Sequence, residues 1–103
     1  MSTFQNLEGF VWDNANEQKI LSKHKISIQE AEQPFFNLYF TEPDIKHSQN
    51  EKRFSLIGVT NLGKVLFIIF TVRNKKIRII SARPASKKER NLYEKAIEEN
   101  SQV

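Results

Sequence analysis

Apolar and polar positions change their spacing several times along the chain, and these changes separate predicted strands from predicted helices. The run Phe10–Trp12 is short and apolar, which predicts a strand. Asn14 and Glu17, three positions apart, resemble an N-terminal capping pair and predict a helix from there through Lys23. Ile20 and Leu21 are expected on the buried side of this helix.

Two further capping boxes predict two more helices. Ser27 and Glu30 open a helix that Pro34 ends early or kinks, because proline lacks the backbone donor and its ring clashes with the preceding turn. Ser86 and Glu89 open the C-terminal helix. The apolar stripe of this last helix consists of Leu92, Tyr93, Ala96 and Ile97.

Between these helices the chain is rich in strand-forming residues. Arg53–Thr60, Lys64–Arg73 and Lys76–Arg83 are separated by connections of three and two residues. Strands joined by such short links must be antiparallel neighbours, since a parallel pair needs a long crossover. Val65–Phe70 is apolar on both faces, which predicts a position in the middle of the sheet.

The order of elements is strand, helix, helix, strands, helix. It predicts an α+β fold in which an antiparallel sheet of three or four strands carries two N-terminal helices and one C-terminal helix. The length of 103 residues and the lack of any linker or repeat predict a single domain over residues 1–103. Hydrophobic residues at 39% and charged residues at 27% are ordinary values for a soluble globular protein.

The short connections also predict which side chains share a face of the sheet. If the links are a three-residue and a two-residue turn, Arg53 and Arg78 both lie opposite Thr71, and Arg73 lies opposite Lys76. We call the resulting polar group the cationic corner; it consists of Arg53, Thr71, Arg73, Lys76 and Arg78. The same register places Arg83 on the other face, unless the strand has already ended.

Positive charge is concentrated in the second half of the chain. The net charge is +4 and the isoelectric point is near 9.5. Half of the 16 basic residues lie between Arg73 and Arg90, where only Glu89 opposes them. Such a cluster is typical of a nucleic-acid-binding surface. A solvated basic face, or a docking surface for an acidic partner, explains the same cluster.

Arginine and lysine clusters suit the cleavage of RNA. Attack by the 2′-hydroxyl places negative charge on the phosphate oxygens, which preorganised cations stabilise without a metal. His24 and His47 are the candidates for proton transfer, since histidine is the residue type whose unperturbed pKa lies near neutral pH; a surface or capping role is the alternative for each. The chain has no cysteine and no metal-type ligand spacing, so we expect no metal and no cofactor.

Targeting signals are also absent from the pattern. Met1–Gly9 lacks a basic region followed by an apolar run, and Val65–Phe70 is too short to span a bilayer. We therefore expect a cytoplasmic protein with no membrane partner.

One set of residues, kept in order along most of the chain, resembles the BrnT family of toxins. The most specific segment is Ile79–Arg83, and the resemblance extends from Phe10 to Glu94. The resembling residues are Phe10–Asp13, Lys23-His24, Ile26-Ser27, Glu30-Ala31, His47-Ser48, Glu51, Arg53, Thr71, Arg73, Ile77–Arg83, Glu89-Arg90 and Tyr93.

This resemblance implies a ribonuclease toxin of a type II toxin–antitoxin pair with a RelE-like fold, which cleaves RNA and so arrests translation. It also implies a partner, a small antitoxin with a DNA-binding domain, and hence a hetero-oligomer. The catalytic candidates that it implies are His24, Arg53, Arg73 and Arg78. The RNA-binding candidates are Lys23, Glu51 and Arg83, together with Lys76 from the cationic corner.

The chain departs from the family pattern at several positions. Asn16 stands where Lys is common, Ile20 where Asn is common, and Lys25 where Gly is common. Pro84 replaces a usual basic residue and Pro34 an aliphatic one. The alternative to an active toxin is therefore a catalytically weakened, toxin-like module that binds RNA or a protein partner.

Overall fold

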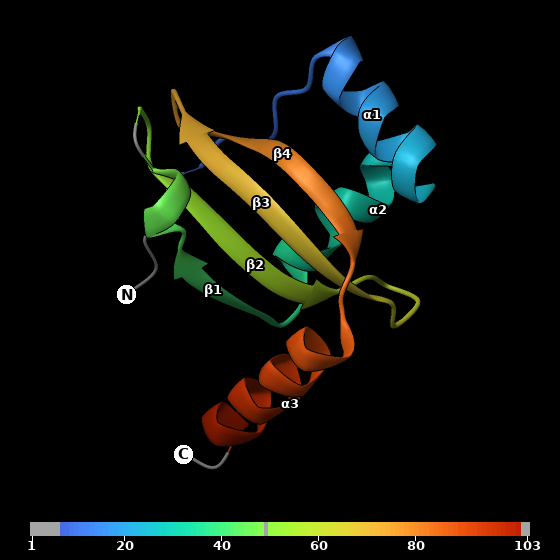
Figure 1. Cartoon of the computed structure of the whole chain (residues 1–103), viewed down its shortest axis with the longest axis vertical. Helices are drawn as coiled ribbons and strands as arrows, with labels where there is room; N and C mark the ends of the chain where they lie inside the picture. Colours follow the sequence, from blue (N-terminus) through green and yellow to red (C-terminus); the bar gives the residue numbers. More distant parts are fainter. Residues whose placement is uncertain (1–6, 49, 102–103) are drawn as a thin grey trace.

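The computed structural model describes residues 7–48 and 50–101; the side chain of His47 lies outside the described part. A four-stranded antiparallel sheet has the strand order β1-β2-β3-β4 (Figure 1). This is the α+β fold expected from the sequence. The elements are α1 (Asn14–His24), α2 (Ile28–Glu32), the 3-10 helix η1 (Gln33–Phe36), β1 (Tyr39–Pro43), the 3-10 helix η2 (Ile45–His47), β2 (Arg53–Val59), β3 (Val65–Arg73), β4 (Lys76–Pro84) and α3 (Lys87–Ser101).

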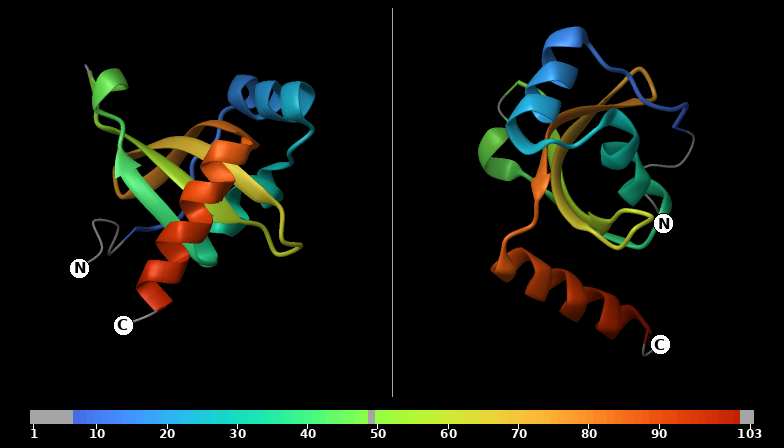
Figure 2. Two further views of the ribbon diagram at one scale, coloured as in Figure 1. Left: turned by 60° about the horizontal axis from the view of Figure 1, so that its bottom comes forward. Right: turned by 90° about the vertical axis from the view of Figure 1, so that its right-hand side faces the viewer.

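The core lies between one face of the sheet and the two N-terminal helices. Ile20 from α1 and Ala31 from α2 pack there with alternate residues of the strands, such as Leu56, Ile68 and Ile79. The predicted burial of Leu21 is wrong: it is 46% exposed, because a residue next to Ile20 on a helix points about 100° away from it. The apolar residues of β3 explain its place between β2 and β4, as the sequence predicted. The opposite face is left for α3, which contacts β1 and β2 at one end of the sheet (Figure 2). None of the described helices is both long and apolar enough to cross a lipid bilayer.

The register of the strands brings the cationic corner together as predicted. Arg53 and Arg78 both pair with Thr71, and Arg73 pairs with Lys76 across the two-residue turn. These residues therefore lie on the face that α1 and α2 leave uncovered.

The predicted facing of Arg83 is wrong, because β4 contains a bulge. Ile69 pairs with Ser81 but Phe70 pairs with Ile79, so Ile80 is an extra residue in β4. One extra residue reverses the alternation of side chains beyond it. Arg83 pairs with Phe67 and lies on the same face as Arg78.

The strand predicted at Phe10–Trp12 is reduced to a single bridge. Phe10 pairs with Ile77 of β4 in parallel, and Gly9 has φ +119°, a conformation that interrupts an extended run. The fourth strand is instead β1, which the sequence pattern did not predict.

The helix ends follow the capping pattern with one exception. Ser27 caps α2 in a complete capping box, and α2 ends at Glu32 before the 3-10 turn that contains Pro34. The predicted start of α1 is off by one residue, since Asp13 and not Asn14 is the N-cap. The Asp13 carboxylate accepts a hydrogen bond from the Asn16 N–H at 2.7 Å.

Candidate functional site

Three neighbouring strands form the floor of the candidate site. Arg53 on β2, Thr71 on β3 and Arg78 on β4 make one row across the sheet. Strands lie about 4.8 Å apart, which puts the backbones of Arg53 and Arg78 about 10 Å from each other. Thr71 is buried, and its hydroxyl donates to the Lys52 carbonyl at 2.7 Å. Thr71 is thus held in place by its own hydrogen bond and lies between two cationic side chains.

Glu51 is the residue around which the arginines of the corner gather. Its two carboxylate oxygens accept hydrogen bonds from Arg73, at 2.9 Å from Nε and 2.8 Å from Nη2. These hydrogen bonds, together with the charges of Arg73, Arg53 and Arg78, hold the pKa of Glu51 below its usual value. Three of the four predicted catalytic residues and one predicted RNA-binding residue therefore share one electrostatic environment.

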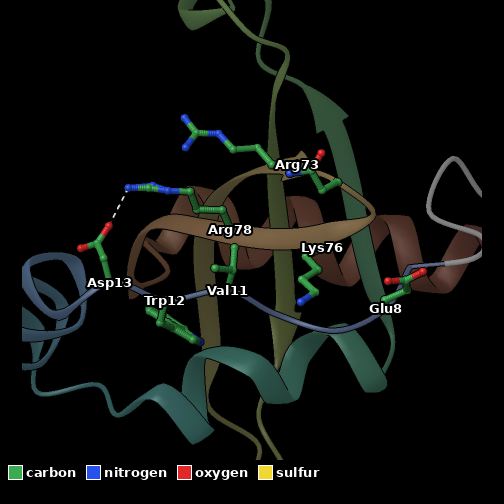
Figure 3. A pocket seen from close by; sticks show the side chains of 8 residues that line it. Glu8, Val11, Trp12, Asp13, Arg73, Lys76 and Arg78 are labelled. Carbon is green, nitrogen blue, oxygen red and sulfur yellow. Dashed lines mark hydrogen bonds and ion pairs between the residues drawn. The ribbon is translucent and has the colours of Figure 1, made fainter.

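Arg78 pairs with an acidic residue that was not among the predicted site residues. Its guanidinium donates to the carboxylate of Asp13 at 2.8 Å (Figure 3). Because Asp13 also caps α1, this pair connects β4 to the start of the helix. The signal for Asp13 was its place in the segment Phe10–Asp13, which carried the family resemblance.

A surface depression of about 610 Å³ opens beside these residues. Figure 3 shows Arg73 and Arg78 extending in the same direction, whereas the ammonium group of Lys76 points away from them. The depression is lined by Glu8, Val11, Trp12, Asp13, Arg73, Asn74, Lys76 and Arg78. Lys76 thus lines the depression, but its ammonium group does not lie beside the guanidinium groups of Arg73 and Arg78.

Arg83 shares the face of the corner but its guanidinium is already engaged. It donates to both carboxylate oxygens of Glu89, at 2.8 and 2.7 Å, and stacks 4.3 Å from the ring centre of Phe67. Glu89 also completes the capping box of α3 with Ser86, at 2.8 and 3.1 Å. The pKa of Glu89 is lowered, chiefly by its hydrogen bonds with Arg83. This geometry favours a structural role, in which Arg83 fastens α3 to β4.

Lys23 and His24 are the last two residues of α1. The opposite end of this helix carries Asp13, the partner of Arg78. At 1.5 Å per residue, the backbones of Asp13 and His24 are about 16 Å apart. No hydrogen bond or ion pair of the described residues joins Lys23 or His24 to the arginines of the corner. The structure therefore does not bring these two candidates into the same cluster.

The corner can bind an anion by exchanging its carboxylates. Glu51 and Asp13 occupy the guanidinium groups that a phosphate would use. A phosphate offers the same bidentate geometry with more negative charge. Among the residues that the structure describes, no group of three or more His, Cys, Asp or Glu side chains is placed to hold a metal ion.

Comparison with known proteins assigns the family. Residues 12–89 match the family model described as the ribonuclease toxin BrnT of type II toxin–antitoxin systems. The crystal structure of the ribonuclease toxin BrnT from Brucella abortus superimposes with a TM-score of 0.56 at 23% identity, covering 77% of this chain and 97% of that one. A search of curated protein sequences finds no relative of this chain. The chain belongs to the BrnT family of ribonuclease toxins of type II toxin–antitoxin systems.

Proposed function

We propose that this chain is a metal-independent endoribonuclease whose cationic corner binds the phosphodiester that is cut. The observation that carries the proposal is that Arg53, Arg73 and Arg78 share the sheet face that α1 and α2 leave uncovered, where Arg73 binds Glu51 and all three charges act on it. Guanidinium groups held by three different strands are preorganised for the charge that develops on the phosphate oxygens. Glu51 is the carboxylate that substrate displaces from Arg73.

Three of the five departures from the family pattern are compatible with an active enzyme. Asn16 donates its side-chain amide to the Ile79 carbonyl and so ties α1 to β4, and Ile20 is 3% exposed in the core. Lys25 adopts the left-handed conformation at the end of α1, where glycine is favoured. These three positions thus have structural roles that leave the arginines of the corner in place.

In the cell, we expect cleavage of RNA in the cytoplasm to arrest translation. The test is inducible expression of the wild type and of Arg53→Ala, Arg73→Ala and Arg78→Ala, scored by growth and by the integrity of bulk RNA. The wild type should stop growth and degrade RNA, and each substitution should relieve both effects. Lys95→Ala is the matched control, because Lys95 is an exposed cation on α3 away from the corner. Growth arrest without RNA loss, or equal toxicity of all variants, would contradict the proposal.

The family assigns an antitoxin as partner, and we propose that this antitoxin is a small protein with a DNA-binding domain that docks on the cationic face. Its complex should bury Arg73, Arg78 or part of the segment Pro84–Arg90. Complementary charge speeds association and blocks the substrate at the same time. Co-purification with the product of the neighbouring reading frame at low and high salt tests this. An association rate that is insensitive to salt would contradict docking on the cationic face. The absence of any complex would contradict the proposal that this gene product is the antitoxin.

A further inference from the structure

A second hollow lies on the same sheet face as the cationic corner, where α3 crosses the sheet. Its volume is about 360 Å³. The sheet contributes Phe40, Ile57, Phe67 and Ile69, and α3 contributes Leu92. We call this hollow the base groove. Half of the twelve residues that line it are apolar, and none of the twelve belongs to the cationic corner.

The base groove continues the rows of side chains that begin at the corner. On β3, Thr71, Ile69 and Phe67 point to the same face, and on β2 Arg53 is followed on that face by Ser55 and Ile57. Two residues of a strand span about 6.7 Å, so the Phe67 row lies about 13 Å from the Thr71 row. A single strand of RNA bound at the corner and running along β3 would therefore reach the base groove with a neighbouring nucleotide.

The rim of the base groove carries three acidic side chains, Glu42, Asp44 and Glu89, and one cation, Lys88. Glu42, an exposed residue of β1, stands beside Ser55, with which it pairs across the strands. Glu89 also lines the groove, and its charge is balanced by Arg83. Carboxylate oxygens repel a phosphate but accept hydrogen bonds from the exocyclic amino group of a base. Arg83 already covers one face of the Phe67 ring, so Phe40 and the aliphatic walls provide the remaining surface on which a base packs.

We propose that the base groove receives the nucleobase one or two positions away from the phosphate bound at the cationic corner, and that it favours bases with an exocyclic amino group over uracil. This inference rests on the proposed function, since it needs RNA at the corner. An acidic segment of the antitoxin is a less suitable occupant of the groove itself, because the carboxylate of Glu42 opposes its charge. The groove thus gives the enzyme sequence preference, while the arginines bind any phosphate.

The experiment measures binding of uncleavable 2′-deoxy hexanucleotides of adenine, cytosine and uracil by fluorescence anisotropy. The wild type should bind the adenine and cytosine strands more tightly than the uracil strand. Leu92→Trp fills the groove, because Leu92 is 45% exposed and a larger side chain can turn into the hollow. It should weaken binding of the adenine and cytosine strands about ten-fold and remove the preference, given the usual contribution of one stacked base. Asn91→Trp, the same change one residue earlier at an exposed position that does not line the groove, is the matched control.

A second variant tests the hydrogen-bond acceptor Glu42 without changing the volume of its side chain. Glu42→Gln should narrow the difference between cytosine and uracil strands, whereas Glu94→Gln, on the exposed side of α3, should not. Equal binding of the three strands by wild type, or binding that Leu92→Trp does not change, would overturn the assignment of a base to this groove. The proposed function would still hold in that case if Arg73→Ala abolishes binding. Loss of the antitoxin complex with unchanged oligonucleotide binding in Leu92→Trp would assign the groove to a protein and overturn the inference. Absence of any nucleic-acid binding by wild type would overturn both proposals.

Discussion

Replacing Arg83 separates a structural arginine from the arginines that we assign to the substrate. Arg83 fastens α3 to the sheet through two hydrogen bonds to Glu89 and a stack on Phe67. Arg83→Ala removes all of these contacts at once. It should therefore lower the stability of the fold while leaving the cationic corner unchanged.

The size of the effect follows from the exposure of the pair. A buried charged hydrogen bond contributes about 1.5–3 kcal/mol and an exposed ion pair about 0–1 kcal/mol. The side chains of Arg83 and Glu89 are 36% and 18% exposed, which places the pair between these limits. With roughly 0.5–1 kcal/mol for the cation over the ring, the loss is about 2 kcal/mol. At about 4–8 °C per kcal/mol for a domain of this size, Tm should fall by roughly 8–16 °C.

The assay combines thermal unfolding, followed by circular dichroism, with RNA cleavage per folded molecule at a temperature below the transition. Arg73→Ala is the matched comparison, because its pair with Glu51 is exposed to solvent and its removal should change Tm little. We expect Arg83→Ala to lose stability and keep its activity, and Arg73→Ala to show the reverse. An Arg83→Ala protein with unchanged Tm and strongly reduced cleavage would refute this reasoning. Arg83 would then be assigned to RNA binding, as the sequence predicted.

Three further predictions concern other parts of the chain. Lys25→Gly should raise the free energy of unfolding by about 0.5–1 kcal/mol. The left-handed conformation costs a non-glycine residue about 1–2 kcal/mol, and the larger conformational entropy of glycine in the unfolded chain offsets about 0.4–1 kcal/mol of that gain. A lower Tm in thermal unfolding would contradict this prediction. The pKa of Glu89 is lowered in the folded state, so its ion pair with Arg83 stabilises the fold at pH values above the ordinary pKa of 4.5. This stabilisation is lost as the pH falls through the lowered pKa. The difference in stability between wild type and Glu89→Gln should therefore shrink from pH 6 to pH 3. His24→Gln should reduce RNA cleavage with little change in Tm; a loss of stability with unchanged activity per folded molecule would make the role of His24 structural.

The central strands and their register were predictable because local signals determine them. The two-residue turn after Arg73 and the three-residue turn before Lys64 allow only antiparallel pairing, and they set Arg53 and Arg78 opposite Thr71. The capping boxes at Ser27 and Ser86 likewise contain all the atoms that they need within four residues. Signals of this kind do not depend on the rest of the fold.

The features that were not predicted depend on distant contacts. β1 is a short edge strand that includes Pro43, and only its pairing with β2 makes it a strand. The bulge at Ile80 leaves no trace in the pattern, because Ile79 and Ile80 are equally apolar. Asp13 reaches Arg78 across 65 residues of sequence, so its pairing became visible only in the fold.

The most direct test of the account is the rate of RNA cleavage by the purified chain in excess chelator under single-turnover conditions. We predict that wild type cleaves RNA without added metal, and that Arg53→Ala, Arg73→Ala and Arg78→Ala each slow cleavage about 100-fold while Lys95→Ala does not. Cleavage that requires magnesium or zinc, or that continues at the wild-type rate in the three arginine variants, would contradict the assignment of the cationic corner as the active site.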